Sequence, residues 1–290
     1  MRSPEDSRSG PSVLVLGASG LLGSHLIARL PHSFPTSAPP PRHGGAAQSA
    51  GVRWLPVRVE VSDRGSVMRA IALARPDVIV NAIGITPQSA ALADPELMHA
   101  VNARFPHELA RLAEACGARV VHVSSDAVFS GARGEYSETD APDPSTLYGR
   151  SKLAGEIGAP HLTIRTSFFG RSPNGRGLVE WLLTQRNRVI EGYVDYVFSG
   201  MAAASFAELV AKAIGTADLE GVYHAGGGPL TKFDLLRALA EALDVPVTVT
   251  PARRGPVNRS LDSSRFFGRV GVPRPSLDDM LATLRSCVDS

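Results

Sequence analysis

The stretch Val13-Leu14-Val15-Leu16-Gly17-Ala18-Ser19-Gly20-Leu21-Leu22-Gly23 decides the fold class. Its apolar start predicts a buried strand, and the spacing of apolar residues from Leu21 to Leu30 predicts a helix directly after the glycines. Glycines in such a turn let the backbone approach the pyrophosphate of a dinucleotide, to which the helix N-terminus offers free N–H groups. The alternative is a turn whose glycines serve only helix packing, but the position between strand and helix favours a dinucleotide site.

Strand and helix patterns alternate through the first 165 residues. Further strands are predicted at Val57–Val61, Val78–Asn81 and Val120–Ser124, and helices at Ser66–Ala74, Pro95–Cys116 and Tyr148–Glu156. Pro106 predicts a break or bend in the longest helix. The segment Pro31–Ala50 is either a poor edge strand or an irregular loop, because it is rich in Pro, Ser, Gly and Ala. The alternation predicts an α/β protein of the Rossmann type, a doubly wound parallel sheet with helices on both faces.

After Arg165 the alternation of strand and helix patterns becomes less regular, which predicts a smaller, mixed α/β substrate lobe. Short strands are expected near Ile164, Val189, Tyr223 and Val247, and helices at Gly177–Gln185, Ser205–Ile214, Lys232–Leu243 and Ser276–Leu284. The predicted organisation is a disordered tail at 1–10, an NAD(P)-binding domain at 11–165 and a substrate-binding lobe at 166–290, whose segments can interleave with the core sheet.

Composition narrows the function class. The chain of 290 residues has a formal net charge of +2 and no basic run, which argues against nucleic-acid binding. No stretch of 18 apolar residues is present, so no membrane span is expected. The two cysteines, Cys116 and Cys287, lie far apart, form no metal-site spacing and favour a reducing, cytoplasmic location. A homodimer is left open.

A second motif carries the chemistry. Tyr148 and Lys152 are four residues apart, so on a helix they share one face. A nearby cation favours the ionised form of a tyrosine, which makes the pair suited to proton transfer at a ketone. A solvated helix face is the alternative reading of these two residues alone. However, the preceding strand ends in the hydroxyls of Ser124 and Ser125, and a hydroxyl at that place can polarise a carbonyl. The order of the three motifs along the chain, glycine turn, serine and then YxxxK, therefore favours catalysis.

These motifs resemble an extended short-chain dehydrogenase/reductase family, that of dTDP-4-dehydrorhamnose reductase. The GxxGxxG spacing of the turn is typical of the extended enzymes. The resemblance covers nearly the whole chain, through the stretches 81–85, 124–131, 134–140, 148–156, 162–167, 180–185, 198–200 and 258–262.

The resemblance implies roles for individual residues. Ser125 matches the catalytic hydroxyl, Tyr148 the proton donor and Lys152 its activator. The glycine turn and the resemblance together assign the cofactor to Gly17, Ser19, Gly20, Leu21, Leu22, Gly23, Arg42, Glu60, Val61, Asn81, Ala82, Ile83, Gly84, Asn102, Tyr148 and Lys152. The substrate is assigned to Ile85, Ser124, Ser125, Asp126, Ala127, Tyr148, Phe168 and Arg259. Asn102 matches a helix asparagine that supports a relay water, with a buried helix-capping asparagine as the structural alternative.

The choice of cofactor follows from charges near the second strand. An acid there would bind the ribose hydroxyls of NAD, but no Asp or Glu occurs between Gly23 and Trp54. Arg42, helped by His43, could pair with a 2′-phosphate, so NADP is favoured over NAD. Two positions depart from the family: Glu60 replaces a more usual Asp, and Ala127 replaces the tyrosine usual in rhamnose-pathway reductases, which leaves the sugar open.

The predicted function is NADPH-dependent reduction of a nucleotide-linked keto sugar of the 4-keto-6-deoxyhexose type. A 4,6-dehydratase is disfavoured, because such enzymes carry a second acid at the position of Ala127. Two alternatives stay open: an NAD-dependent sugar-nucleotide epimerase, and a non-catalytic NADP-binding subunit similar to the regulatory subunit of methionine adenosyltransferase. The intact set of Ser125, Tyr148 and Lys152 argues against a purely structural role.

Overall fold

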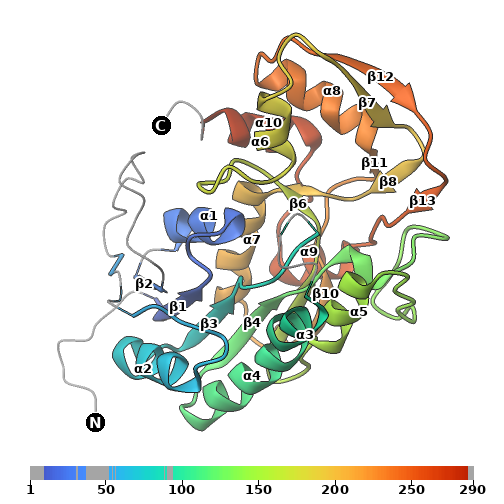
Figure 1. The fold of residues 1–290 in the computed structure, drawn as a ribbon. Coiled ribbons are helices and arrows are strands. Elements are labelled where there is room, and N and C mark those ends of the chain that lie inside the picture. The colour runs from blue at the N-terminus through green and yellow to red at the C-terminus, as the bar shows by residue number, and fades with distance from the viewer. Residues whose placement is uncertain are drawn as a thin grey trace.

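A parallel sheet forms the centre of the molecule (Figure 1). The computed structural model describes residues 10–30, 32–36, 52–53, 55, 57–87, 89 and 94–286, so Arg42, His43 and the expected tail, except Gly10, lie outside them. Within the described part, six parallel strands follow the order β2-β1-β3-β4-β5-β10. They are β1 Val13–Leu16, β2 Ser33–Thr36, β3 Val78–Asn81, β4 Arg119–Val123, β5 Leu162–Arg165 and β10 Gly221–His224. The predicted doubly wound α/β class is confirmed.

The strand order places the glycine turn at the switch point of the sheet. Strand β1 pairs with β2 on one side and β3 on the other, so consecutive crossovers leave in opposite directions. Open α/β sheets bind ligands beyond the carboxyl ends of the strands at such a point. Gly17–Gly23 follows β1, Asn81–Gly84 follows β3 and Ser124–Ala127 follows β4. All three predicted site segments therefore lie at one edge of the sheet.

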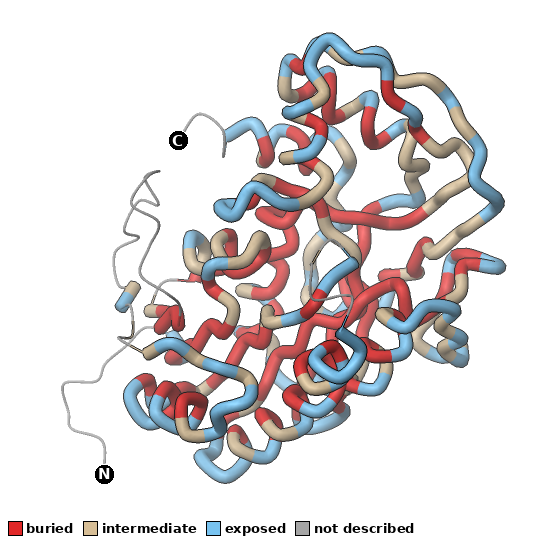
Figure 2. The backbone as a smooth tube through the Cα atoms, in the orientation of Figure 1, coloured by how far each residue is buried: buried red, intermediate tan, exposed pale blue. Residues whose placement is uncertain are grey.

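Helices cover both faces of the sheet, which explains why its strands are buried along nearly their whole length. Alternate residues of β1 belong to two separate apolar clusters. One cluster includes α1 (Leu21–Arg29) and α7 (Ala203–Gly215), and the other includes α2 (Arg64–Ala74) and α4 (Phe105–Ala115). Buried residues accordingly concentrate along the central strands (Figure 2).

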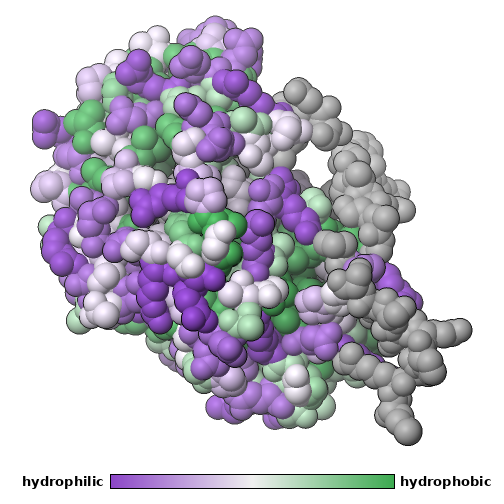
Figure 3. Space-filling view, turned by 180° about the vertical axis from the view of Figure 1, so that it is seen from behind, coloured by the Kyte–Doolittle hydropathy of each residue, from purple (hydrophilic) through white to green (hydrophobic). Residues whose placement is uncertain are grey.

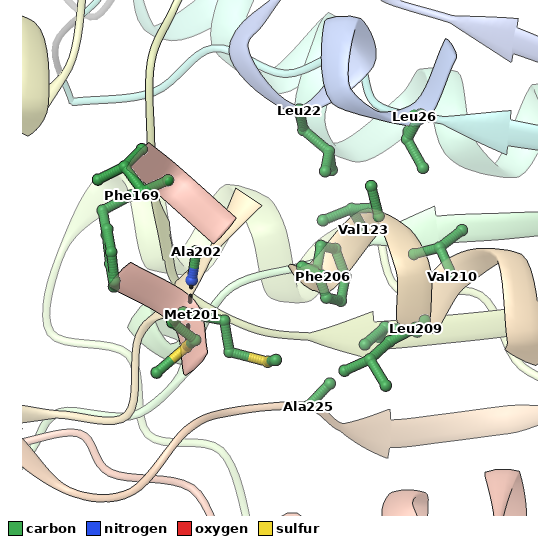
Figure 4. Packing of buried hydrophobic residues seen from close by; sticks show 14 of the residues in the cluster. Leu22, Leu26, Val123, Phe169, Met201, Ala202, Phe206, Leu209, Val210 and Ala225 are labelled. Carbon is green, nitrogen blue, oxygen red and sulfur yellow. Dashed lines mark hydrogen bonds between the residues drawn. The ribbon is translucent and has the colours of Figure 1, made fainter. Parts of the chain in front are cut away.

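The first of these clusters joins segments that are far apart in the sequence. Figure 4 shows Leu22 and Leu26 of α1 on one side of the cluster and Phe206 and Val210 of α7 on the other, with Val123 of β4 beside them. Leu26, Phe206 and Val210 are fully buried. The N-terminal helix is thus held in place by a helix almost 200 residues later.

The structure corrects the predicted strand at Val57–Val61. These residues form no strand; only Leu55 bridges Thr36, next to the edge strand β2. Val57, Val59 and Val61 instead pack against the apolar cluster that includes α2 and α4, which accounts for their alternating pattern. Of the two alternatives for Pro31–Ala50, the structure shows an edge strand, β2, at its start.

The long predicted helix is present, but its irregularity differs from a break at Pro106. It consists of α3 (Pro95–His99), a π-helical segment η2 (Ala100–Arg104) and α4, which continue one another. The wider turn comes just before Pro106, which lacks the N–H of a regular helical bond. The proline is therefore accommodated without ending the helix.

The C-terminal half builds a smaller lobe and also returns to the sheet (Figure 1). All four predicted helices are present there, as α6 (Leu178–Leu183), α7, α8 (Lys232–Ala242) and α10 (Leu277–Ser286); a further helix, α9 (Ser264–Val270), was not predicted. Strand β10 and helix α7 pack with the sheet, so segments interleave as expected. The remaining short strands are β6 Phe168–Phe169, β7 Val189–Tyr193, β8 Tyr196–Phe198, β9 Met201–Ala202, β11 Leu230–Thr231, β12 Thr248–Ala252 and β13 Val257–Asn258.

The surface carries apolar side chains from separate elements. On the face shown in Figure 3, hydrophobic residues lie in patches among hydrophilic ones. Exposed large apolar side chains include Val189 of β7, Leu73 of α2 and Trp181 of α6. Among the described helices, none has the length and apolar character that a membrane crossing requires.

Candidate active site

The glycine turn is closely packed against β3. Gly17 has a φ of 80°, and a Cβ on it would lie 2.9 Å from the carbonyl group of Ala82. A Cβ on Gly23 would collide with the carbonyl oxygen of Gly17. Helix α1 begins at Leu21, and no side chain of the described residues caps its N-terminus. The turn therefore presents bare backbone and a helix N-terminus, the combination that binds phosphate.

A cavity of about 690 Å³ extends from this turn. Several residues assigned to the cofactor line it: Gly17, Ser19, Glu60, Val61 and Ile83. Other lining residues were not singled out by the sequence analysis, among them Thr36, Arg58 and Arg104. Arg58 lies in the segment interpreted as a strand, and that interpretation hid its position on the cavity wall.

Asn81 is fixed at the end of β3 by two hydrogen bonds. Its Oδ1 accepts from the N–H of Ile83 at 3.1 Å, so its Nδ2 is the donor toward His122 Nδ1, at 3.2 Å. Burial, followed by the charge of Lys152, holds the pKa of His122 well below its usual value, so this imidazole is neutral. The pair holds the segment Asn81–Gly84 against β4.

The π-helical segment η2 places Asn102 between two parts of the site. Its Oδ1 accepts from the N–H of Ile85, and its Nδ2 donates to the carbonyl of Ile85, both at 2.9 Å. The second Nδ2 hydrogen goes to Ser151 Oγ at 3.0 Å. Protein groups thus use both donors of Asn102, which clamps the segment after β3 to α5 (Leu147–Ala154). Asn102 lies inside η2 and caps no helix among the described residues, so it does not match the helix-capping alternative.

Two glycines allow α5 to approach its neighbours closely. A Cβ on Gly149 would collide with the carbonyl oxygen of Ala127, and one on Gly155 with that of Asn102. Thr146 caps the helix by accepting from the N–H of Gly149 at 3.0 Å. Tyr148 is thereby brought against the short helix η3 (Asp126–Val128), directly after Ser125.

The structure places Ser125 and Tyr148 close to each other, and Lys152 lies one helical turn from Tyr148 on α5. The Ser125 hydroxyl accepts from the N–H of Ala127 at 3.1 Å and donates to Asp126 Oδ1 at 3.2 Å, and it lies close enough to the Tyr148 phenol to lower the pKa of that phenol. Lys152 is 4% exposed, and its Nζ donates to the carbonyl of Val123 at 2.8 Å. A Cβ on Gly84 would lie 4.0 Å from that Nζ, so the ammonium faces the segment after β3.

Burial dominates the protonation of Tyr148 and Lys152, the two ionisable groups of the predicted catalytic set. It raises the pKa of Tyr148 to about 12, an effect that the Ser125 hydrogen bond opposes and the Asp126 charge reinforces. It lowers the pKa of Lys152 to about 8, against the attraction of Glu156. At neutral pH the phenol therefore keeps its proton, and Lys152 is cationic but poised close to neutrality.

Ser124 points away from Ser125, into a buried charged network. Its hydroxyl donates to Glu156 Oε1 at 2.8 Å. Arg165 binds the same carboxylate with Nε at 2.8 Å and Nη2 at 2.7 Å, and its Nη1 lies 3.2 Å from Nε2 of His224. The Ser124 hydroxyl, predicted to contact substrate, is thus already bound to Glu156. The charged network joins the segments that follow α5 and β4 to β5 and β10.

The other predicted substrate residues occupy different surroundings. Ile85 packs with Met98 and Val101 beside Tyr148, next to the catalytic groups. Phe168 stacks on Phe206 of α7, with ring centroids 6.2 Å apart. Asp126 is 8% exposed, and burial raises its pKa although the charges of Arg259 and Lys232 lower it.

Two residues near Asp126 were missed as site residues. The pKa of Tyr196 is raised, by burial first and then by the charge of Asp126. Lys232 has a pKa lowered by burial and raised by Asp126. The sequence has three lysines in 290 residues, and this scarcity was the one sequence feature that could have marked Lys232 as a candidate site residue. No sequence spacing connects positions 126, 196 and 232.

Comparison with known proteins identifies the family. The RmlD substrate binding domain family matches residues 11–267. The dTDP-4-dehydrorhamnose reductase of Salmonella typhimurium is 32% identical over 234 residues, which cover 71% of this chain and 78% of that protein. A probable low-salt glycan biosynthesis reductase of Haloferax volcanii is 26% identical over 94% of this chain and 96% of its own.

Solved structures agree on the fold. The dTDP-4-dehydrorhamnose reductase of Bacillus anthracis in complex with NADP aligns with a TM-score of 0.79 at 21% identity, over 97% of this chain and all of that one. A UDP-glucose 4-epimerase of Thermus thermophilus aligns with a TM-score of 0.75 at 22% identity, over 96% and 99%. The chain therefore belongs to the RmlD substrate binding domain family, and its resemblance to the dTDP-4-dehydrorhamnose reductases, which are NAD(P)-dependent oxidoreductases, is confirmed.

Proposed function

We propose that this protein reduces the keto group of a nucleotide-linked sugar of the 4-keto-6-deoxyhexose type, with NADPH as reductant and Tyr148 as proton donor. The observation that carries the proposal is the proximity of the Ser125 and Tyr148 hydroxyls, with the buried Lys152 one helical turn along α5 from Tyr148. Residues 11–165 serve mainly the cofactor and residues 166–290 mainly the substrate. The similarity to dTDP-4-dehydrorhamnose reductases supports a sugar-nucleotide substrate.

The residues present fit a dinucleotide. Gly17 and Gly23 allow the turn to pack closely against Ala82 and against itself, and the N-terminus of α1 can accept the pyrophosphate. The cavity along Glu60, Val61 and Ile83 is the place for the adenosine half, and Asn81–Gly84 leads from it toward Lys152. When bound, a reduced nicotinamide supplies the hydride for the keto carbon.

Each catalytic side chain then has a distinct task. The Ser125 hydroxyl donates a hydrogen bond to the keto oxygen of the substrate and orients it. The phenol of Tyr148 gives its proton to the same oxygen as negative charge develops there. Its raised pKa ensures that the proton is present at neutral pH, and the ammonium of Lys152 stabilises the phenolate that remains.

Loss of the phenol proton tests this assignment. Tyr148→Phe removes the donor and leaves the ring, so we expect turnover to fall by about 10²–10⁴-fold while NADPH binding stays close to wild type. The measurement is oxidation of NADPH with a dTDP-4-keto-6-deoxyhexose. Near-normal turnover in the variant would contradict the role of Tyr148. Tight NADPH binding by wild type without turnover would favour the regulatory-subunit alternative.

Preference for NADPH is supported by charges at the cavity wall. Strand β2 ends at Thr36 without an acid that would repel a 2′-phosphate, and Arg58 lines the same cavity. Arg58 Nε lies 2.7 Å from Glu60 Oε1 and its side chain is 74% exposed, so the guanidinium keeps donors for a ligand. Arg42 is proposed as a second contact from the sequence alone.

Arg58→Gln tests this preference. We expect the Kd of NADPH to rise about fivefold or more while that of NADH changes little, because only NADPH carries the 2′-phosphate. The matched control is Arg69→Gln, whose guanidinium is also exposed and bound to Asp63 instead. Equal effects on both cofactors would count against Arg58 as the phosphate contact.

A further inference from the structure

A three-stranded sheet in the lobe gathers two cations near the catalytic edge. Strand β8 pairs with β11 on one side and with β13 on the other. This order brings Lys232, which follows β11, and Arg259, which follows β13, to Tyr196 and Phe198 of β8. Lys232 Nζ lies 3.9 Å from the Phe198 ring centroid and 5.5 Å from that of Tyr196, while Arg259 Nη1 lies 3.4 Å from Tyr196 Oη.

Some N–H donors of Lys232 and Arg259 have no hydrogen-bond acceptor among the described residues. Among the described residues, no side-chain or backbone acceptor hydrogen-bonds to the half-buried Lys232, whose contacts are with aromatic rings. Arg259 Nε is buried without a partner in the same part of the chain. Buried donors normally have acceptors, so these invite an acceptor from a ligand.

Asp126 balances the charge only in part. It interacts electrostatically with both cations, yet neither forms an ion pair with it within 4.0 Å in the described residues. The charge of Arg259 also acts on the exposed carboxylate of Asp143, so Asp126 is the buried carboxylate that interacts with both cations. Because Asp126 directly follows Ser125, the two cations lie beside the proposed reaction centre.

We propose that Lys232 and Arg259 together bind an oxyanion of the sugar-nucleotide substrate, opposite Asp126. The inference rests on the proposed function for the identity of the ligand. The oxyanion is either a phosphate of the diphosphate linkage or a carboxylate on the sugar, and both offer the acceptor oxygens that an ammonium and a guanidinium bind. Phe198 and Tyr196 hold the ammonium in place through their ring faces.

The test compares Lys232→Met with Lys212→Met. Methionine keeps most of the apolar stem and removes the charge, and Lys212 is an exposed lysine of α7 that serves as the matched control. Binding is measured by calorimetry with dTDP, UDP, UDP-glucose and UDP-glucuronate, and thermal unfolding checks that each variant is folded. We expect Lys232→Met to lose about tenfold or more in affinity, Lys232→Arg to recover part of it, and Lys212→Met to match wild type.

The pattern across the probes identifies the oxyanion. A loss with all four probes indicates the diphosphate, and a loss only with UDP-glucuronate indicates a sugar carboxylate. Affinities of a folded Lys232→Met protein within about twofold of wild type for every probe would overturn the proposal. A wild type that binds none of them would overturn it too. If the protein binds these probes as expected but does not oxidise NADPH, that result would contradict the reductase proposal and leave the oxyanion site standing.

An independent readout uses the rarity of lysine. Reductive methylation with ¹³C-formaldehyde labels Lys152, Lys212, Lys232 and the N-terminus, and the Met variants assign the signals. Addition of the tightest-binding probe should shift the Lys232 signal and leave that of Lys212 in place. An unmoved Lys232 signal under saturating probe would contradict a direct contact.

Discussion

At the scale of a single residue, the buried ammonium of Lys152 lowers the stability of the folded protein, and we propose that this cation serves catalysis. It is nearly inaccessible, its ammonium donates to one described acceptor, the carbonyl of Val123, and burial lowers its pKa to about 8. An unfolded lysine keeps its proton up to a pH of about 10.4. The folded protein therefore carries at neutral pH a charge that the interior disfavours, as expected where catalysis needs a cation.

This cost predicts how stability changes with pH. Above pH 8 the folded protein releases the Lys152 proton while the unfolded chain retains it, so the free energy of unfolding should rise by about 1–3 kcal/mol between pH 8 and 10. Denaturant unfolding at several pH values measures it. Lys152→Met should be more stable than wild type at pH 7 and show a smaller rise, whereas Lys212→Met should behave as wild type. A free energy of unfolding that falls over this range would contradict the assignment.

At the scale of elements, the site depends on how closely α5 packs against η3. A Cβ on Gly149 would meet the carbonyl oxygen of Ala127, and backbone cannot yield as a flexible side chain does. Gly149→Ala should therefore push α5 outward, separate Tyr148 from Ser125 and cost about 1–3 kcal/mol of stability. We expect turnover to fall more steeply than NADPH affinity, as kinetics and thermal unfolding can show.

The matched control for this change is Gly158→Ala. Nothing lies within 4 Å of a Cβ at Gly158, and its φ is not positive, so the added methyl has room. Its effect on stability should stay within about 0.5 kcal/mol, with turnover unchanged. Equal losses in both variants would show that the close contact at Gly149 is not decisive.

The elements also show what could be predicted from the sequence. The glycine turn and YxxxK depend on local spacing, so the strand and helix around each were predicted. The predicted strand at Val57–Val61 was wrong because an apolar alternation does not reveal whether a partner strand can pair. The valines of this segment pack against an apolar cluster without forming a strand. The π-helical turn at Asn102 is invisible in apolar periodicity, because one extra residue leaves both flanking helices regular. Lys232 needed the pairing of β8 with β11, which no local pattern encodes.

At the scale of the whole molecule, one buried carboxylate joins segments from both halves of the chain. Glu156, at the end of α5, binds Ser124 after β4 and Arg165 of β5, and Arg165 in turn contacts His224 of β10. The two charged side chains are 8% and 6% exposed, so neither can be satisfied by water once the other is lost.

Removal of this charge predicts a large effect on stability. Glu156→Gln should cost about 3–5 kcal/mol, because the guanidinium of Arg165 remains buried without its counter-charge. The control is Glu208→Gln, which breaks the more exposed pair with Arg29 and should cost about 0.5 kcal/mol or less. Chemical denaturation compares the two. Similar small losses would mean that the buried network contributes little to the native state.

The return of the chain to the sheet at β10 has a consequence for biosynthesis. When a ribosome has released the first 165 residues, β5 still lacks its neighbour and the apolar side of α1 lacks α7. The sheet can close only after the lobe strands β7 to β9 and helix α7 have emerged and residue 224 has followed. The nascent chain thus exposes an unpaired parallel edge for about sixty residues of synthesis, the kind of surface that attracts chaperones. A chimeric protein that combines the lobe of one relative with the sheet of another must therefore take α7 and β10 from the relative that supplies the rest of the sheet.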